Sequence, residues 1–199
     1  MVSRKRCLAA LACWLLALGT STAAPVEIAG VKLEDTVKVS GSTLQLNGAG
    51  IRYKAVFQVY VAGLYAGRKV ATPEQFFAST DAKRLRLTML REVDSNELGK
   101  AFIKGFQDNA QKGELGKLLP GLARMGQVFA DQKKLLPGDT VTIDWVPGTG
   151  TVITIAGQVQ GEPFKEVEFF NAMMRVWLGA SPADWKLKES LLGKPAGGS

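Results

Sequence analysis

The chain has 199 residues, with 25 Lys and Arg against 18 Asp and Glu and a net charge of +7. It contains no histidine, and its two cysteines, Cys7 and Cys13, both lie near the N-terminus. Beyond them the chain lacks the ligands of the usual zinc sites, the groups of a Ser-His-Asp or Cys-His nucleophile, and a histidine for haem. We therefore expect no metal and no cofactor, and we assign any chemistry to Arg, Lys, Tyr or carboxylates.

Residues 1–23 have the three parts of a cleavable signal peptide. Arg4 to Arg6 are positive, residues 7–18 are apolar and too short to span a bilayer, and small residues follow up to Ala23. An uncleaved membrane anchor and a lipoprotein attached through Cys13 are the weaker alternatives. We expect cleavage near Ala23 and a periplasmic or secreted protein. Cleavage removes both cysteines and three of the positive charges.

Residues 24–193 suit a single domain with a sizeable core, and residues 194–199 are expected to be disordered. The densest positive cluster, Lys83, Arg84, Arg86 and Arg91, fits a solvated strand edge at least as well as an anionic partner. We therefore expect no nucleic acid partner.

The first half of the domain is dominated by strand patterns. Short strands punctuated by turns fill residues 26–46, and residues 51–65 form the longest candidate, with Arg52 and Tyr60 on the same face. Thr72 and Pro73 start a short helix, residues 84–91 alternate as a half-buried strand, and Asp94 or Ser95 caps a longer helix.

The second half returns to helices and then to a hairpin. A helical pattern covers residues 114–134 with an interruption near Pro120, and a hairpin covers residues 140–155. One more strand over 158–164, an amphipathic helix over 167–178 and a last helix that starts with Ser181-Pro182-Ala183-Asp184 and ends at Gly193 complete the pattern. This order predicts an α+β fold with a largely antiparallel sheet.

Gly48-Ala49-Gly50 followed by Arg52 does not fit a dinucleotide-binding loop, because Tyr53 replaces the third glycine and a strand follows. The glycines instead suggest a sharp bend from one strand into the next. Arg52 points to a partly apolar face and needs a partner there, and a carboxylate such as Asp94 is one candidate.

This segment resembles the first core strands of the chalcone isomerase family, through residues 48–52, Phe57, Val59-Tyr60 and Gly63-Leu64-Tyr65. Later matches are Arg91-Glu92, Trp177-Leu178-Gly179 and Leu191-Leu192-Gly193. The resemblance implies an open-faced β-sandwich, in which a long antiparallel sheet packs against a helical layer with a ligand cleft between them. Of the catalytic set of the family's enzymes, only the arginine is retained, as Arg52. Tyr60, Leu98, Ala101, Gly105 and Val176 replace the other polar groups, so we assign no catalytic residue.

Arg52 and Tyr60 resemble instead the residues that hold a carboxylate in the fatty-acid-binding branch of the fold. Their spacing of eight would place both side chains on one face of a regular strand. Leu98, Ala101 and Val176 would then line the path of an acyl tail. The expected partner is a fatty acid or another amphipathic carboxylate. A transient contact with an envelope membrane and the oligomeric state stay open.

Two alternatives remain at this point. One is an isomerase or lyase with an altered substrate, using Arg52 and one of Tyr53, Tyr60 and Tyr65. The other is a structural or protein-interaction domain with a closed cleft, in which Arg52 is paired to an internal carboxylate.

Overall fold

A seven-stranded antiparallel sheet with the order β11-β10-β9-β6-β5-β4-β3 forms the centre of the computed structural model, which describes residues 25–194. The expected signal peptide and all but the first residue of the expected C-terminal tail lie outside the described residues. The strands of this sheet are β3 (Thr36–Val39), β4 (Ser42–Lys54), β5 (Phe57–Ala66), β6 (Lys83–Met89), β9 (Thr140–Val146), β10 (Gly150–Ile155) and β11 (Gln158–Val159). The α+β class and the long antiparallel sheet are as predicted.

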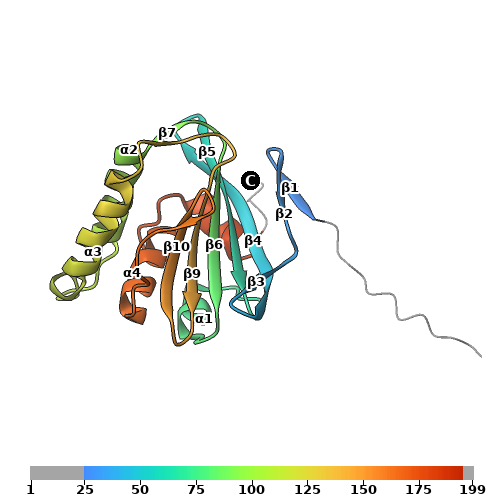
Figure 1. Ribbon diagram of the computed structural model, residues 1–199. Helices are drawn as coiled ribbons and strands as arrows, with labels where there is room; N and C mark the ends of the chain where they lie inside the picture. Colours follow the sequence, from blue (N-terminus) through green and yellow to red (C-terminus); the bar gives the residue numbers. More distant parts are fainter. Residues whose placement is uncertain (1–24, 195–199) are drawn as a thin grey trace, which may run out of the picture.

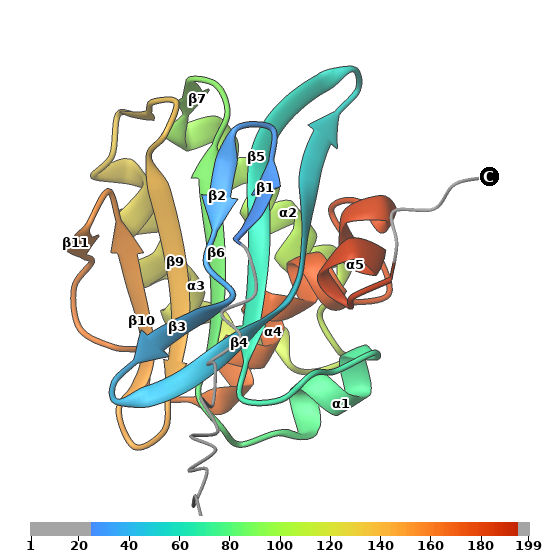
Figure 2. The ribbon, with the colours of Figure 1, turned by 90° about the vertical axis from the view of Figure 1, so that its right-hand side faces the viewer.

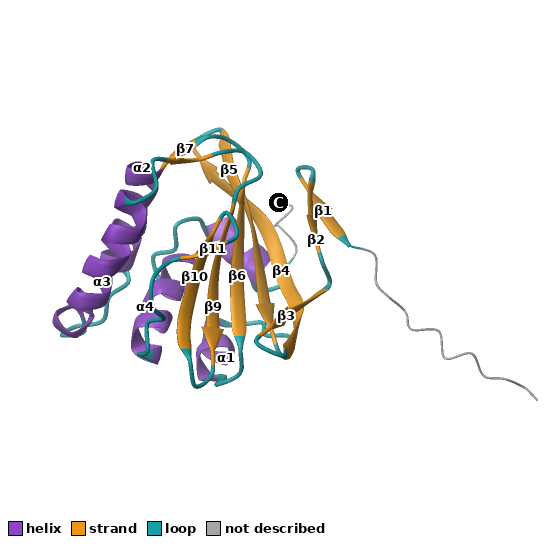
Figure 3. Cartoon of the chain, viewed as in Figure 1, coloured by secondary structure: helices purple, strands orange, loops and turns teal. Residues whose placement is uncertain are grey.

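Helices cover one face of the sheet, and a small hairpin lies beside the other (Figures 1 and 3). The helices are α1 (Pro73–Ala78), α2 (Ser95–Asp108), α3 (Leu115–Ala130), α4 (Val167–Leu178) and α5 (Trp185–Leu191). The hairpin is β1 (Val26–Ile28) with β2 (Val31–Leu33), and β7 (Val93–Asp94) pairs with β8 (Lys134–Leu135). None of the helices in the described part of the chain is long and apolar enough to cross a membrane.

Side chains along β5 point alternately to the two faces of the sheet, and an apolar cluster covers each face. Tyr60, Ala62 and Leu64 belong to the large core under the helices. Val61 and Tyr65 belong to a smaller cluster on the other face, which includes Leu33 of β2. The pattern of strand 51–65 correctly indicated that both of its sides are covered.

The prediction of a single strand over residues 51–65 is wrong. The chain reverses at Ala55 and Val56, so β4 and β5 are antiparallel neighbours, and Arg52 lies directly opposite Tyr60. Ala55 takes a positive φ of 53° in this two-residue turn. The reversal lacks the Asn, Asp or Gly residues that usually announce such a turn, and the sequence pattern therefore continued through it.

The glycines at 48 and 50 do not form a bend between strands. They lie inside β4, next to a register shift between Leu46 and Gly48, and α5 packs directly on them. A Cβ at Gly48 would overlap the carbonyl oxygen of Ser190 and lie 2.8 Å from that of Leu191. These positions are glycine because the C-terminal helix approaches the strand backbone; Figure 2 shows α5 beside β4.

Two helices begin at an expected cap, Thr72 and Asp94, and the cap of the last helix, Asp184, is the final residue of the segment expected to start it. Thr72 accepts from the backbone N–H of Gln75, Asp94 from that of Glu97, and Asp184 from those at the start of α5. Two expectations are corrected. Helix α3 runs through Pro120 without a break, and only Gln158–Val159 of the expected strand 158–164 joins the sheet. Phe164 makes an isolated bridge to Thr151.

Candidate functional site

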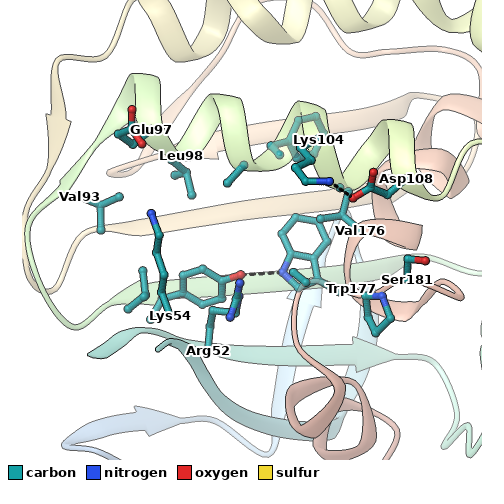
Figure 4. A pocket seen from close by; sticks show the side chains of 17 residues that line it. Arg52, Lys54, Val93, Glu97, Leu98, Lys104, Asp108, Val176, Trp177 and Ser181 are labelled. Carbon is teal, nitrogen blue, oxygen red and sulfur yellow. Dashed lines mark hydrogen bonds and ion pairs between the residues drawn. The ribbon is translucent and has the colours of Figure 1, made fainter. Parts of the chain in front are cut away.

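A pocket of about 340 Å³ opens between α2 and the β4–β5 pair, closed at one end by α4 and the loop before α5. Its lining includes all five residues expected from the sequence to contact a ligand: Arg52, Tyr60, Leu98, Ala101 and Val176. The strands supply the polar residues of this set, and the helices supply the apolar ones. Figure 4 shows Leu98 and Val176 on the helix side of the pocket and Arg52 reaching toward it from β4.

Arg52 and Tyr60 meet by strand pairing and not by spacing along one strand. They are opposite residues of an antiparallel pair and therefore project from the same face of the sheet. The register shifts just beyond them, between Arg52 and Tyr53, and Val59 is left without a partner in β4. Val59 also lines the pocket. The hairpin thus brings three neighbouring side chains to the same cavity.

The carboxylate beside Arg52 is Asp184, and the expected partner Asp94 instead caps α2. The Arg52 guanidinium lies 3.6 Å from Asp184 Oδ2 and also donates to the backbone carbonyl of Tyr53. Asp184 is already occupied, because it accepts from the backbone N–H groups of Tyr53, Lys186 and Leu187. Its pairing with Arg52 is accordingly longer than a hydrogen bond. The guanidinium keeps donors for a second anion.

Tyr60 is a buried hydrogen-bond donor in the wall of the pocket. Its hydroxyl oxygen accepts from Trp177 Nε1 at 2.9 Å, which leaves its own proton for another acceptor. Burial raises the pKa of Tyr60 above its usual value, while the Trp177 bond and the charge of Arg52 act in the opposite direction. The hydroxyl is therefore protonated at neutral pH and is suited to donate a hydrogen bond.

Trp177 belongs to the site although its spacing in the sequence indicated only a core residue. Its ring packs in the core beside Phe102, while its indole N–H reaches Tyr60. A buried tryptophan needs an acceptor for this N–H, which is the one signal that the sequence offered.

The apolar part of the pocket lies between α2 and α4. Leu98 and Ala101 are three residues apart on α2 and share a face, and Val176 faces them from α4. A Cβ at Gly105 would lie 2.9 Å from Val176 Cγ1, so a glycine there allows the two helices to approach. The lining also contains four charged side chains: Lys54, Glu97, Lys104 and Asp108.

This arrangement suits an anion attached to an apolar body. Among residues 25–194 there is no group of three carboxylates that could hold a metal ion. The cavity beside Arg52 contradicts the closed cleft of the structural alternative, whereas the pairing of Arg52 with a carboxylate that this alternative expected is present in Asp184. The enzyme alternative keeps its geometry, since Tyr60 is opposite Arg52, but a raised pKa makes Tyr60 a poor base at neutral pH.

Comparison with known proteins identifies the family to which the chain belongs. The fold resembles that of a fatty-acid binding protein from Arabidopsis thaliana, with a TM-score of 0.64 and 19% sequence identity over 82% of this chain and 92% of that one. A search of curated protein sequences gave no significant match. The model of the chalcone isomerase-like family matches residues 25–193. That match spans the whole domain around the pocket, and the chain belongs to the chalcone isomerase-like family.

Proposed function

We propose that this protein binds a fatty acid or a similar amphipathic carboxylate in the pocket between α2 and the β4–β5 pair. The observation that carries the proposal is the division of the pocket into a donor end, Arg52 and Tyr60, and an apolar part formed by Leu98, Ala101 and Val176. A guanidinium offers two parallel N–H donors to a carboxylate, and the phenol adds a third. The likeness to a fatty-acid binding protein of the same fold supports this proposal.

The energetics are sufficient for binding. The pocket of about 340 Å³ lies at the small end of the range for small-molecule sites, which is about 300–1,000 Å³. Ten buried methylene groups contribute about 8 kcal/mol, and a charge-assisted hydrogen bond adds about 1.5–3 kcal/mol. Association opposes this by about 4–15 kcal/mol; at the low end of that cost about 5–7 kcal/mol remains, which corresponds to a Kd of roughly 10–100 μM.

Titration with a panel of fatty acids and the fatty alcohols of matching length tests the proposal. Arg52→Ala should weaken binding of the acids about tenfold or more and leave the alcohols unchanged, because only the acids carry the charge. Arg86→Ala is the matched control, since Arg86 is half-buried beside Tyr65 on the sheet face opposite the pocket. Unchanged acid affinity in Arg52→Ala would refute the role of Arg52. No binding across the panel would refute the function, and turnover of a flavanone or enone panel would favour the enzyme.

We propose further that the protein acts outside the cytoplasm, in the periplasm or after secretion. The charged, apolar and small-residue order of residues 1–23 supports this. N-terminal sequencing of the protein from fractionated cells tests it. A mature chain that starts near Ala24 in the exported fraction is expected, and a cytoplasmic chain that begins at Met1 would contradict export.

A further inference from the structure

The turn between β4 and β5 exposes apolar side chains that the rest of the described structure does not cover. Val56 is 82% exposed, Phe57 57% and Tyr53 40%. These three residues, with Lys54 and Ala55 between them, form what we call the hairpin tip. In Figure 2 the β4–β5 hairpin extends beyond the small β1–β2 hairpin at the top of the molecule.

Turn geometry does not account for the residues of the tip. The other two-residue hairpin turns in residues 25–194 each have glycine at the second position, Gly30, Gly41 and Gly157, with positive φ. The β4–β5 turn has the β-branched Val56 at that position, after Ala55 with its positive φ. Valine is disfavoured in such turns and is normally selected for packing, yet this one packs against nothing described. Its side chain is available to a partner.

Positive charge accompanies these apolar groups. The guanidinium of Arg91 lies 4.8 Å from the centre of the Phe57 ring, and Lys54 lies opposite Phe57 in the hairpin. Neither Lys54 nor Arg91 is among the ion pairs formed within residues 25–194. The nearest acid along the chain, Glu92, is engaged by Lys134 at 2.9 Å. The surface therefore combines exposed apolar groups with unneutralised cations.

The tip is continuous with the pocket. Lys54 and Val59, at the ends of β4 and β5 that join at the turn, both line the cavity. Figure 4 shows Lys54 extending from β4 toward Val93 and the start of α2, on the side of the pocket away from Ser181. A surface that receives the tip therefore lies next to the pocket.

We propose that the hairpin tip docks on an anionic phospholipid bilayer, with Val56 and Phe57 entering the interface and Lys54 and Arg91 facing the lipid phosphates. Apolar side chains flanked by Lys and Arg are the composition that binds such surfaces. The tip offers only three apolar side chains, whereas a stable protein interface takes about 800 Å² from each partner, so the composition favours lipid. The docking itself does not depend on the proposed function. Only its purpose does, because a bilayer would supply and accept the fatty acids that the protein is proposed to bind.

Co-sedimentation with vesicles tests the docking. The protein is produced from the full-length sequence, so that any processing at its N-terminus is native, and is mixed with phosphatidylcholine vesicles with or without phosphatidylglycerol. We expect binding only with phosphatidylglycerol, and loss of binding as salt is added. Val56→Asp should lower the vesicle partition coefficient about tenfold or more, and Arg91→Gln about fivefold. Neither residue lines the pocket.

Val159→Asp is the matched control, because Val159 is 61% exposed on β11, at the opposite edge of the sheet. It should bind vesicles as the wild type does. Equal vesicle binding by Val56→Asp and Val159→Asp, or none by the wild type, would overturn the proposal. So would a dimer in sedimentation velocity that Val56→Asp dissociates, since the tip would then be an interface between copies.

Fatty acid titration without vesicles separates the two proposals. Unchanged solution affinity in Val56→Asp with weakened vesicle binding supports docking as a separate property of the tip. Vesicle binding that depends on Val56 in a protein that binds no fatty acid would leave the docking in place and refute the proposed function.

Discussion

Asp184→Asn should strengthen the binding of a fatty acid, because Asp184 is the negative charge that a ligand carboxylate meets beside Arg52. The pair lies at 3.6 Å, with side chains that are 24% and 13% exposed. The quantity that changes ligand affinity is the repulsion between Asp184 and a ligand carboxylate on the far side of the guanidinium, and two unit charges about 6 Å apart interact by about 0.7 kcal/mol in bulk water and about 3 kcal/mol at an effective dielectric constant near 20. Screening by the water that reaches Arg52 favours the lower end of this range. We expect a gain of about 1.5 kcal/mol, which is roughly tenfold in Kd.

Asparagine removes the charge and keeps the cap of α5, because its one side-chain oxygen can still accept from the backbone N–H groups of Lys186 and Leu187 and asparagine caps helices about as well as aspartate. The hydrogen bond from the Tyr53 backbone N–H to the second oxygen is lost, and this loss is the same for the acid and the alcohol. Calorimetric titration of wild type and variant with a fatty acid and the matching alcohol measures the effect. Tighter binding of the acid alone is expected. An unchanged acid affinity, or an equal gain for the alcohol, would refute the electrostatic reasoning.

Three further predictions concern stability, each measured by urea unfolding. Gly48→Ala should destabilise the protein by about 3 kcal/mol or more, because backbone atoms of the α5 segment block the new methyl group, whereas Gly116→Ala, with open space, should stabilise it by about 0.5–1 kcal/mol. Tyr60→Phe should cost about 1–3 kcal/mol by leaving the Trp177 N–H unpaired, and adding Trp177→Phe should recover part of that loss; strict additivity would argue against the bond. Burial lowers the pKa of Lys83 to about 8, so the unfolded chain holds this proton more tightly, and deprotonation favours the folded state. Relative to Lys83→Met, the wild type should therefore gain about 2 kcal/mol as pH rises from about 8 to about 10.5, and parallel curves would contradict this.

The helices were the most predictable part of the fold, because their signals are local. Thr72, Asp94 and Asp184 each cap the helix that follows, and the helix expected over residues 167–178 is α4 with those bounds. Capping depends on a side chain and the backbone two or three residues later, so a single sequence contains the whole interaction.

The five residues expected at the site do line one pocket, but the geometry that brings them together was not predicted, and their contact with a ligand stays a prediction. Arg52 and Tyr60 were expected together because of an even spacing on one strand, whereas a turn without glycine brings them together as opposite residues of a hairpin. Both residues line the same pocket, as expected, but strand pairing and not their spacing along one strand brings them together. Trp177 was assigned to the core because helical spacing reports which face is buried and not which hydrogen bond its indole makes.

The contact between Arg52 and Asp184 shows why the rest of the site could not be predicted from the sequence. Asp184 reaches Arg52 only because Gly48 and Gly50 let α5 lie against β4, and no local pattern links these residues. The same contact would give α5 a role in the proposed binding although none of its residues lines the pocket. Asp184 caps the first turn of α5 and lies beside Arg52, so it sets the charge next to that guanidinium. The glycines of β4 therefore act on the site through the C-terminal helix, and not through a bend or a phosphate loop in the strand that contains them.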